Sequence, residues 1–404
     1  MSSTGSDGAG SERLNRLLGF LEQDPGNWQL INDAAAEAIR VGDSDRARSL
    51  IDRGLALAGL DAGRRFALGN LMLANQDASR AEALFAELAQ QGGLHPALSY
   101  NLGYAQFEQG RYADSIATLR QIGDAEVVQA PQRDLLLAKA FYFLQDLDAA
   151  LEHIDRYLRG SKDDQEGLGL KALMVFDMGK PAEATAVASR LLALNPNNAY
   201  GHLTLGSIAL EQKQPAVAKA HIEQTLAQQP LMGRAWSVLA FADLQQNQLE
   251  AGQAHFDKAV RYMPNHLGTW HGLAWTQLLL GNITAARQAV DSAMALDRNF
   301  AENHGTLAVI QVLCGQLDEA ETSIKRGIRL DPKSPSSQYA RSLLLAERQQ
   351  PEASKRLIER ILTEAGMKDA AAIAAAAVNF RPGHRGLGTP PAQALAPDGK
   401  RILH

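Results

Sequence analysis

Large apolar, small and polar positions recur along the chain at one fixed interval. When a unit is taken to begin at Ala199, the same pattern returns every 34 residues, with a single step of 35. A period of this length is typical of repeat architectures, in which each unit buries its apolar face against its neighbours. The ten units begin at residues 28, 62, 96, 131, 165, 199, 233, 267, 301 and 335.

Two positions of every unit hold only small residues. Positions 8 and 20 are Ala, Gly or Ser in all ten units, whereas position 7 is mostly Leu and position 24 is almost always large and apolar. A small residue at a fixed place allows two helices to cross closely. Turn-forming stretches such as EQGRY and LLGNI separate the two halves of a unit, and a proline near position 32 ends several units. Each unit is therefore predicted to be a helix–turn–helix.

The two ends of the repeat array differ from its middle. The polar residues 1–10 are expected to be disordered, and residues 11–27 are predicted to form an N-terminal capping helix with Ser11 as its N-cap. The solenoid is predicted to span residues 28–366. Residues 367–380 (MKDAAAIAAAAVNF) are predicted to form a C-terminal capping helix, and the Gly- and Pro-rich residues 381–404 a flexible tail.

The repeated positions resemble those of the tetratricopeptide repeat (TPR) family. The segments YNLGYAQFEQGRYADSIATL (100–119) and WHGLAWTQLLLGNITAARQAV (270–290) carry its small, large and turn positions. The resemblance implies an all-α, right-handed superhelical solenoid of about ten 34-residue helix–turn–helix repeats with capping helices. It departs from the family at position 7 in two units, where Lys171 and Arg341 replace leucine, and most early units lack the proline at position 32.

The resemblance also implies a concave inner face, which the family draws from positions 2, 5, 9, 12 and 13 of each unit. About half of the 23 aromatic residues of the chain lie at these positions. We favour exposure to a groove for Tyr104, Phe241 and Trp275, and packing into the next unit for Phe107, Tyr142 and Phe176. The candidate partner-binding residues are Phe66, Asn70, Tyr100, Asn101, Tyr104, Tyr142, Tyr200, Phe241, His271 and Trp275.

An aromatic trough of this kind suits an extended or helical peptide, because tyrosine and tryptophan are rigid anchors at interfaces. The chain is therefore expected to be an interaction scaffold or adaptor that binds a peptide or partner protein in its concave groove. The alternative is a self-associating structural subunit, a possible homodimer, in a larger assembly such as secretion or polysaccharide-export machinery. Fold alone does not decide between them.

Composition excludes several other classes. The net charge is −5 with a pI near 6.1, so nucleic acid is not an expected partner. No apolar run approaches the ~18 residues of a membrane helix, and LLGFL at residues 17–21 is too short for the core of a signal peptide. We expect a cytoplasmic protein without membrane insertion. An N-terminal anchor that has been removed is the open alternative.

The sequence carries no signature of catalysis or of a cofactor. The chain lacks the phosphate-binding and nucleophile motifs of the common enzyme folds, so it is expected not to be an enzyme and to hold no cofactor or metal. The single cysteine, Cys314, excludes an internal disulfide and is expected to be a small buried residue. His202 and His304 occupy position 4, where Trp236 and Trp270 stand in other units, so a packing role is expected for them.

Overall fold

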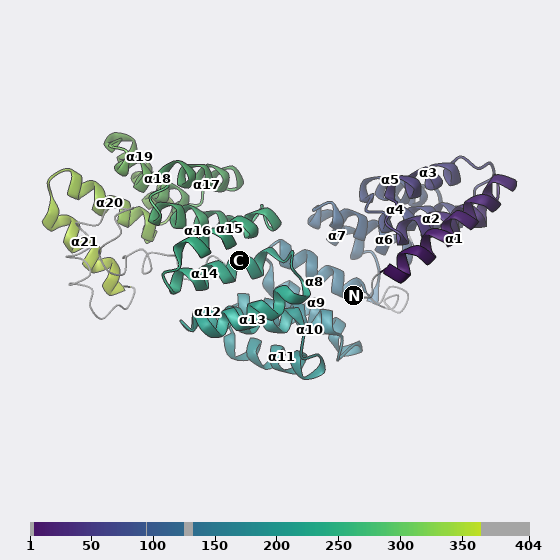
Figure 1. The fold of residues 1–404 in the computed structure, drawn as a ribbon, viewed down its shortest axis with the longest axis horizontal. Coiled ribbons are helices and arrows are strands. Elements are labelled where there is room, and N and C mark those ends of the chain that lie inside the picture. The colour runs from purple at the N-terminus through teal and green to yellow at the C-terminus, as the bar shows by residue number, and fades with distance from the viewer. Residues whose placement is uncertain (1–3, 94, 125–131, 365–404) are drawn as a thin grey trace. The chain divides into compact units, whose positions relative to one another are not determined.

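The computed structural model describes residues 4–93, 95–124 and 132–364 (Figure 1). These residues form 21 α-helices and contain no strand, which confirms the prediction of an all-α helical-repeat solenoid. The chain divides into two compact units, Met1–Gly167 and Leu168–His404, which are described separately. The predicted capping helix at residues 367–380 and the predicted tail at 381–404 lie outside the described residues.

The first unit contains an N-terminal helix and four helix pairs. In each pair the even-numbered helix, here called the A helix, packs against the following B helix, and each B helix packs against the next A helix. The bounds are α1 Thr4–Gln23, α2 Trp28–Arg40, α3 Ser44–Leu55, α4 Ala62–Ala74, α5 Ala78–Gly92, α6 Pro96–Glu108, α7 Tyr112–Leu119, α8 Arg133–Phe143 and α9 Leu147–Gly160. The helix α10, Gln165–Asp177, contains the division between the two units.

The second unit continues the alternation of A and B helices. Its helices are shown in teal, green and yellow in Figure 1. The bounds are α11 Pro181–Leu194, α12 Ala199–Glu211, α13 Pro215–Gln228, α14 Gly233–Gln245, α15 Leu249–Tyr262, α16 Leu267–Leu279, α17 Ile283–Leu296, α18 Ala301–Leu313, α19 Leu317–Leu330, α20 Pro335–Glu347 and α21 Pro351–Glu364.

The first helix differs from its predicted bounds. Because α1 begins at Thr4, Ser11 lies inside the helix rather than at its N-cap. The helix ends at Gln23 rather than at residue 27, since Pro25 cannot continue it. Asn27 instead starts the next helix: its side chain accepts a hydrogen bond from the backbone N–H of Leu30.

The small residues at position 8 have a direct packing reason. In the A helices α4, α6 and α12, this position is a glycine that faces the large side chain at position 24 of the same repeat. A Cβ on Gly69 would lie 2.3 Å from the ring of Phe85, and one on Gly103 would lie 2.8 Å from Leu119. A Cβ on Gly206 would lie 2.8 Å from Ile222. The A and B helices of these repeats can therefore approach only where the A helix carries no side chain.

Every turn between an A helix and its B helix passes through one residue in the left-handed backbone region. This residue has φ between 58° and 80° in all ten pairs, and it is glycine in only half of them. The residues are Gly42, Gln76, Gly110, Gln145, Gly179, Lys213, Asn247, Gly281, Gly315 and Gln349. Residues other than glycine adopt this backbone conformation at a cost in free energy. The packing of the flanking helices must offset that cost.

Replacing Gly281 with alanine is expected to lower the free energy of unfolding by about 1 kcal/mol, because the new Cβ is strained at φ 80°. Lys213→Ala is the matched control, since Lys213 already holds a Cβ at φ 59° in the equivalent turn. Urea unfolding followed by circular dichroism compares the two variants. If both variants lose the same free energy of unfolding, the left-handed backbone conformation is not the cause of the destabilisation.

A hydrogen bond at position 4 ties successive repeats of the second unit together. Trp236 Nε1 donates to the carbonyl oxygen of Pro230 (2.8 Å), and Trp270 Nε1 donates to that of Pro264 (2.7 Å). The same bond runs from His202 Nε2 to Pro196 O (2.9 Å), from His304 Nε2 to Arg298 O (2.8 Å) and from Gln338 Nε2 to Pro332 O (2.9 Å). The two histidines thus make the same contact as the tryptophans. The carbonyls lie just beyond the preceding B helix, where intrahelical donors are lacking.

Candidate functional site

Two tyrosines and two asparagines come together on the A helices α4 and α6 of the first unit. The rings of Tyr100 and Tyr104, one turn apart on α6, stack with centroids 6.4 Å apart and an interplanar angle of 11°. Asn101 Nδ2 donates a hydrogen bond to Asn70 Oδ1 across the two helices (2.6 Å). Both tyrosines and Asn101 are half-buried, and Asn70 is exposed. We call these four residues the tyrosine face.

Both tyrosines of this face remain protonated at neutral pH. Burial raises the pKa of Tyr100 to about 12, and the neighbouring Tyr104 adds to the effect. Burial also raises the pKa of Tyr104, and Glu108, which accepts a hydrogen bond from the Tyr104 hydroxyl, raises it further. The tyrosine face therefore carries neutral phenol groups beside the amides of Asn70 and Asn101.

Phe66, also predicted for the site, packs against other aromatic side chains of the first unit. Its ring packs against Phe85 (centroids 5.6 Å apart) and against His95 (5.8 Å). It is half-buried and packs against the buried core around Phe85. Phe66 therefore contributes to packing between helices of the first unit.

A second aromatic cluster lies at the turns that follow α6 and α8. The rings of Tyr112 and Phe143 stack at 4.8 Å with an interplanar angle of 6°, and Phe107 meets both edge-on at 5.3 and 5.7 Å. Tyr142 contacts Phe143 edge-on at 6.3 Å. Phe143 and the adjacent Leu144 are 53% and 47% exposed. We call Phe107, Tyr112, Tyr142, Phe143 and Leu144 the turn patch.

Tyr112, Phe143 and Leu144 are not among the binding residues that the sequence predicts. The predicted binding residues lie at repeated positions of the A helices, whereas these three side chains flank the turn between an A helix and its B helix. The stretch FYFLQ at residues 141–145 is the available signal, since turns such as EQG and DMG occupy the same place elsewhere. An apolar departure from a polar turn position indicates an exposed patch.

Two of the predicted residues in the second unit remain half-buried. Tyr200 lies close to α10: a Cβ built on Gly169 would be 2.7 Å from the Cβ of Tyr200. Phe241 packs edge-on against Phe256, with centroids 4.9 Å apart and an interplanar angle of 89°. Both side chains thus contribute to contacts between helices.

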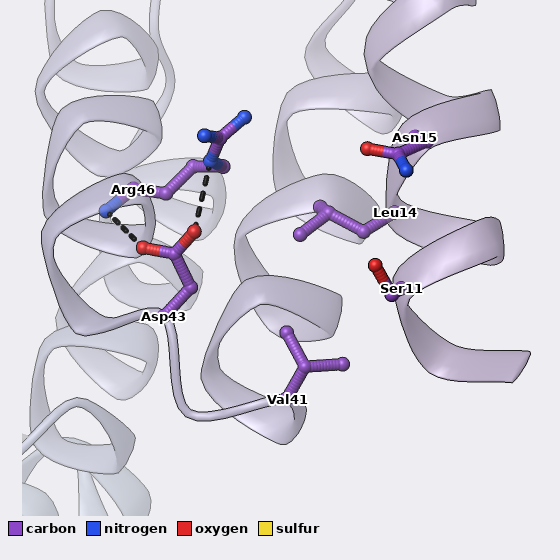
Figure 2. Close-up of a pocket in the computed structure, with 6 residues that line it drawn as sticks. All are labelled: Ser11, Leu14, Asn15, Val41, Asp43 and Arg46. Carbon is purple, nitrogen blue, oxygen red and sulfur yellow. Dashed lines mark hydrogen bonds and ion pairs between the residues drawn. The ribbon is translucent and has the colours of Figure 1, made fainter. Parts of the chain in front are cut away.

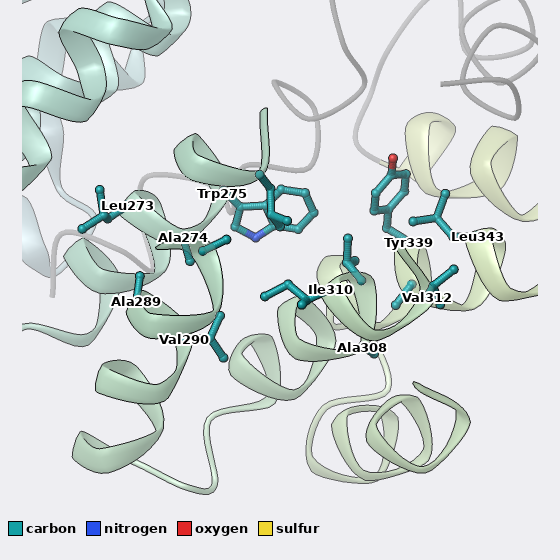
Figure 3. Packing of buried hydrophobic residues seen from close by; sticks show 14 of the residues in the cluster. Leu273, Ala274, Trp275, Ala289, Val290, Ala308, Ile310, Val312, Tyr339 and Leu343 are labelled. Atoms are coloured by element: carbon teal, nitrogen blue, oxygen red, sulfur yellow. The ribbon is translucent and has the colours of Figure 1, made fainter. Parts of the chain in front are cut away.

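The expected exposure of Trp275, and with it that of His271, is wrong. Their exposed fractions are 5% and 1%. Trp275 Nε1 donates to His271 Nε2 (2.9 Å), and Thr306 Oγ1 of the next A helix lies 2.9 Å from the same nitrogen. Figure 3 shows the ring of Trp275 beside that of Tyr339, with centroids 5.9 Å apart. The neighbouring repeats cover these positions, and burial lowers the pKa of His271 to about 3, so the imidazole is neutral.

A pocket of about 340 Å³ lies between α1 and the turn from α2 to α3 (Figure 2). Leu14 and Val41 form its apolar part. Asp43 opposite them accepts hydrogen bonds from the backbone N–H of Arg46 (3.1 Å) and from Arg46 Nε (2.9 Å). Asp43 and Arg46 therefore pair with each other, and Asp43 also caps the N-terminus of α3. None of the predicted site residues lines this pocket.

The part of the chain that the structure describes offers little for catalysis. It contains no group of three or more histidine, cysteine, aspartate or glutamate side chains that could hold a metal ion. Cys314 is exposed, not buried as expected, because it directly follows the last residue of α18 at the turn. None of the described helices is long and apolar enough to cross a lipid bilayer.

Family models described as tetratricopeptide repeat match residues 66–125, 135–199 and 243–302. No curated protein matches the chain in sequence. Among solved structures, a monomeric IFIT1 mutant with m7Gppp-AAAA is 16% identical, with 92% of this chain and 94% of that chain covered and a TM-score of 0.56. This likeness shows the fold alone.

Two further solved structures resemble the chain less closely. The Cut9–Hcn1 hetero-tetramer of the APC/C is 12% identical, with 91% of this chain and 86% of that chain covered and a TM-score of 0.44. MamA from Desulfovibrio magneticus RS-1 is 23% identical, with 44% and 97% covered and a TM-score of 0.32.

The matched repeats and the paired helices agree with one another. Arrays of this kind are generally scaffolds that bind proteins or peptides, and the fold is typical of proteins without catalytic activity. The alternation of A and B helices, the glycines at position 8 and the three matched segments all indicate the same repeat. The chain is a tetratricopeptide repeat protein.

Proposed function

We propose that the protein is an interaction scaffold whose first unit binds a peptide segment of a partner protein on the tyrosine face. The observation that carries this proposal is the half-buried, stacked pair Tyr100 and Tyr104 beside the bonded amides of Asn70 and Asn101. Stacked rings offer a wide apolar surface at small cost in side-chain entropy. The amides and phenols supply the polar groups that an extended backbone requires.

An ion pair borders this face on the side of the following repeats. Lys139 Nζ pairs with the carboxylate of Glu166, and Glu166 is close enough to Tyr100 to raise its pKa. Lys139 and Glu166 thus limit the apolar surface, as charged groups at the rim of an interface do. The bound segment is expected to place apolar side chains over the tyrosines and its backbone amides beside Asn70 and Asn101.

Replacing Tyr100 and Tyr104 together with alanine is expected to weaken peptide binding by about tenfold or more, because two central anchors are lost. A displayed library of random peptides is selected on the wild-type protein. The enriched peptides are then labelled, and their affinities for both proteins are measured by fluorescence anisotropy. Circular dichroism establishes that the variant keeps its helix content.

Tyr262→Ala is the control, since Tyr262 on α15 is 38% exposed and belongs to the second unit. It should leave the affinity of the selected peptides unchanged. If the library yields no binder, or if the selected peptides bind the double variant as well as the wild type, the tyrosine face is not the binding site.

A further inference from the structure

Carboxylates without a cationic partner among the described residues border the exposed apolar surface of the turn patch. Glu108, at the end of α6, is exposed, and in the described part of the chain it forms no ion pair. Its carboxylate accepts a hydrogen bond from Tyr104 and raises the pKa of Tyr112, although burial is the main reason that the pKa of Tyr112 is raised. Glu108 therefore lies between the tyrosine face and the turn patch.

Two more carboxylates follow the patch in sequence. Asp146 caps α9 by accepting a hydrogen bond from the backbone N–H of Ala149 (3.2 Å), and Asp148 lies in the first turn of the same helix. Both are exposed, and neither pairs with a cation among the residues described. The surface around Phe143 and Leu144 is thus negative.

The nearby cation does not neutralise this charge. Arg111 follows α6 at the turn, but its guanidinium pairs with Glu82 and lies 3.7 Å from Asp114. It is therefore engaged with two carboxylates of its own. An apolar surface with surplus carboxylates selects against acidic segments, because like charges would be brought together.

We infer that the segment bound by the first unit is basic and apolar, with an arginine or lysine that pairs with Glu108 beside large apolar side chains on Phe143 and Leu144. This inference rests on the proposed function and names the chemistry of its ligand. The stacked rings of Tyr112 and Phe143 leave no gap between them, so the ligand lies on the exposed part of Phe143 rather than between the rings. A guanidinium is the better cation for such a place, since it can pair with a carboxylate and also stack on a ring.

Three short fluorescein-labelled peptides of equal length test the inference. They share the same leucine and proline residues and differ only in their polar residues, which are all arginine, all glutamate or all serine. The arginine peptide is expected to bind wild-type protein most tightly. Its affinity should fall as salt rises from about 0.1 M to about 1 M, because the Debye length shrinks from about 10 Å to about 3 Å.

Two variants separate the charge from the apolar surface. Glu108→Gln should weaken the arginine peptide by about fivefold and leave the serine peptide unchanged, because one partly exposed ion pair is lost. Phe143→Ser combined with Leu144→Ser should weaken both of these peptides by about tenfold. Leu231→Ser combined with Leu296→Ser is the matched control, since these leucines of the second unit are 65% and 41% exposed, and it should change neither affinity.

Several results would overturn the inference. If the glutamate or serine peptide binds as tightly as the arginine peptide, the ligand is not basic, while loss of binding in the tyrosine variant would still support the proposed function. If none of the three binds although library-selected peptides do, the inference fails and the proposed function stands. If the protein sediments as a dimer that Phe143→Ser with Leu144→Ser converts to a monomer, a second copy occupies the turn patch instead.

Discussion

Replacing Gly305 with alanine is expected to lower the free energy of unfolding by roughly 2–3 kcal/mol, although alanine is normally the better helix former. A Cβ at this position of α18 would lie 2.3 Å from the backbone nitrogen of Ser337 and 2.5 Å from the carbonyl carbon of Ser336. These atoms belong to the backbone of α20 and cannot rotate away, as the end of a flexible side chain could. The two A helices would have to separate.

Gly19→Ala provides the control for this prediction, because Gly19 lies inside α1 and a Cβ there would meet nothing within 4 Å. It is expected to raise the free energy of unfolding by about 0.5–1 kcal/mol. Urea unfolding of both variants, followed by far-UV circular dichroism, measures the difference. Opposite signs support the close approach of α18 and α20, whereas stabilisation by both variants would contradict it.

Replacing Asp177 with alanine is expected to lower the free energy of unfolding by roughly 3–5 kcal/mol, since the charge of Arg234 would be left buried. Asp177 at the end of α10 and Arg234 in the first turn of α14 form a two-pronged ion pair in the second unit. Arg234 Nη1 donates to one carboxylate oxygen at 3.0 Å and Nη2 to the other at 2.5 Å. Their side chains are only 1% and 14% exposed.

Two comparisons measure what this pair contributes. The double variant Asp177→Asn with Arg234→Met removes both charges, so it is expected to cost less than Asp177→Ala alone. Asp291→Ala breaks the exposed pair of Arg287 and Asp291, whose side chains are 44% and 60% exposed, and should cost less than about 0.5 kcal/mol. If Asp177→Ala lowers the free energy of unfolding no more than Asp291→Ala does, burial of the ion pair does not determine how much its loss destabilises the protein.

The helix pairs could be predicted because their cause is local and repeats. A small residue at position 8 and a large one at position 24 recur in one register, and the close approach of Gly69 and Phe85 is the contact that this pattern requires. The same reasoning placed His202 and His304 in the role of the tryptophans at position 4. A contact that recurs within each repeat can be predicted from the sequence of the repeat alone.

The exposure of the inner positions could not be predicted in the same way, because it depends on how closely neighbouring repeats approach. Tyr104 on α6 remains half-buried, whereas Trp275, at the equivalent position 9 of α16, is buried against Tyr339. The difference arises from the following repeats, where α20 contacts α18 at Gly305. Register gives the face of a helix but not the curvature of the array.

The residues of the tyrosine face could be predicted from their positions in the repeat, whereas those of the turn patch could not. Asn70, Tyr100, Asn101 and Tyr104 do come together, since positions 5, 6 and 9 of adjacent A helices share a face. The turn patch could not be predicted from the repeat, because Phe143 and Leu144 depart from the polar residues found at this turn in several other repeats. The predicted burial of Cys314 is wrong for a related reason: its neighbour Leu313 is apolar, but Cys314 itself lies just past the end of α18, at the turn.

The left-handed residue in every turn bears on how such an array can change in length during evolution. Deleting residues 247–280 would join Gln246 to Gly281, and the new turn would still contain one residue at the backbone conformation that the turn requires. Duplicating the same block would create one new join, from Leu280 to a second copy of Asn247, and each turn would again contain one left-handed residue. Gene segments coding for 34 residues are therefore interchangeable units of gain and loss, whereas an insertion of another length inside a helix would shift the left-handed residue away from the turn.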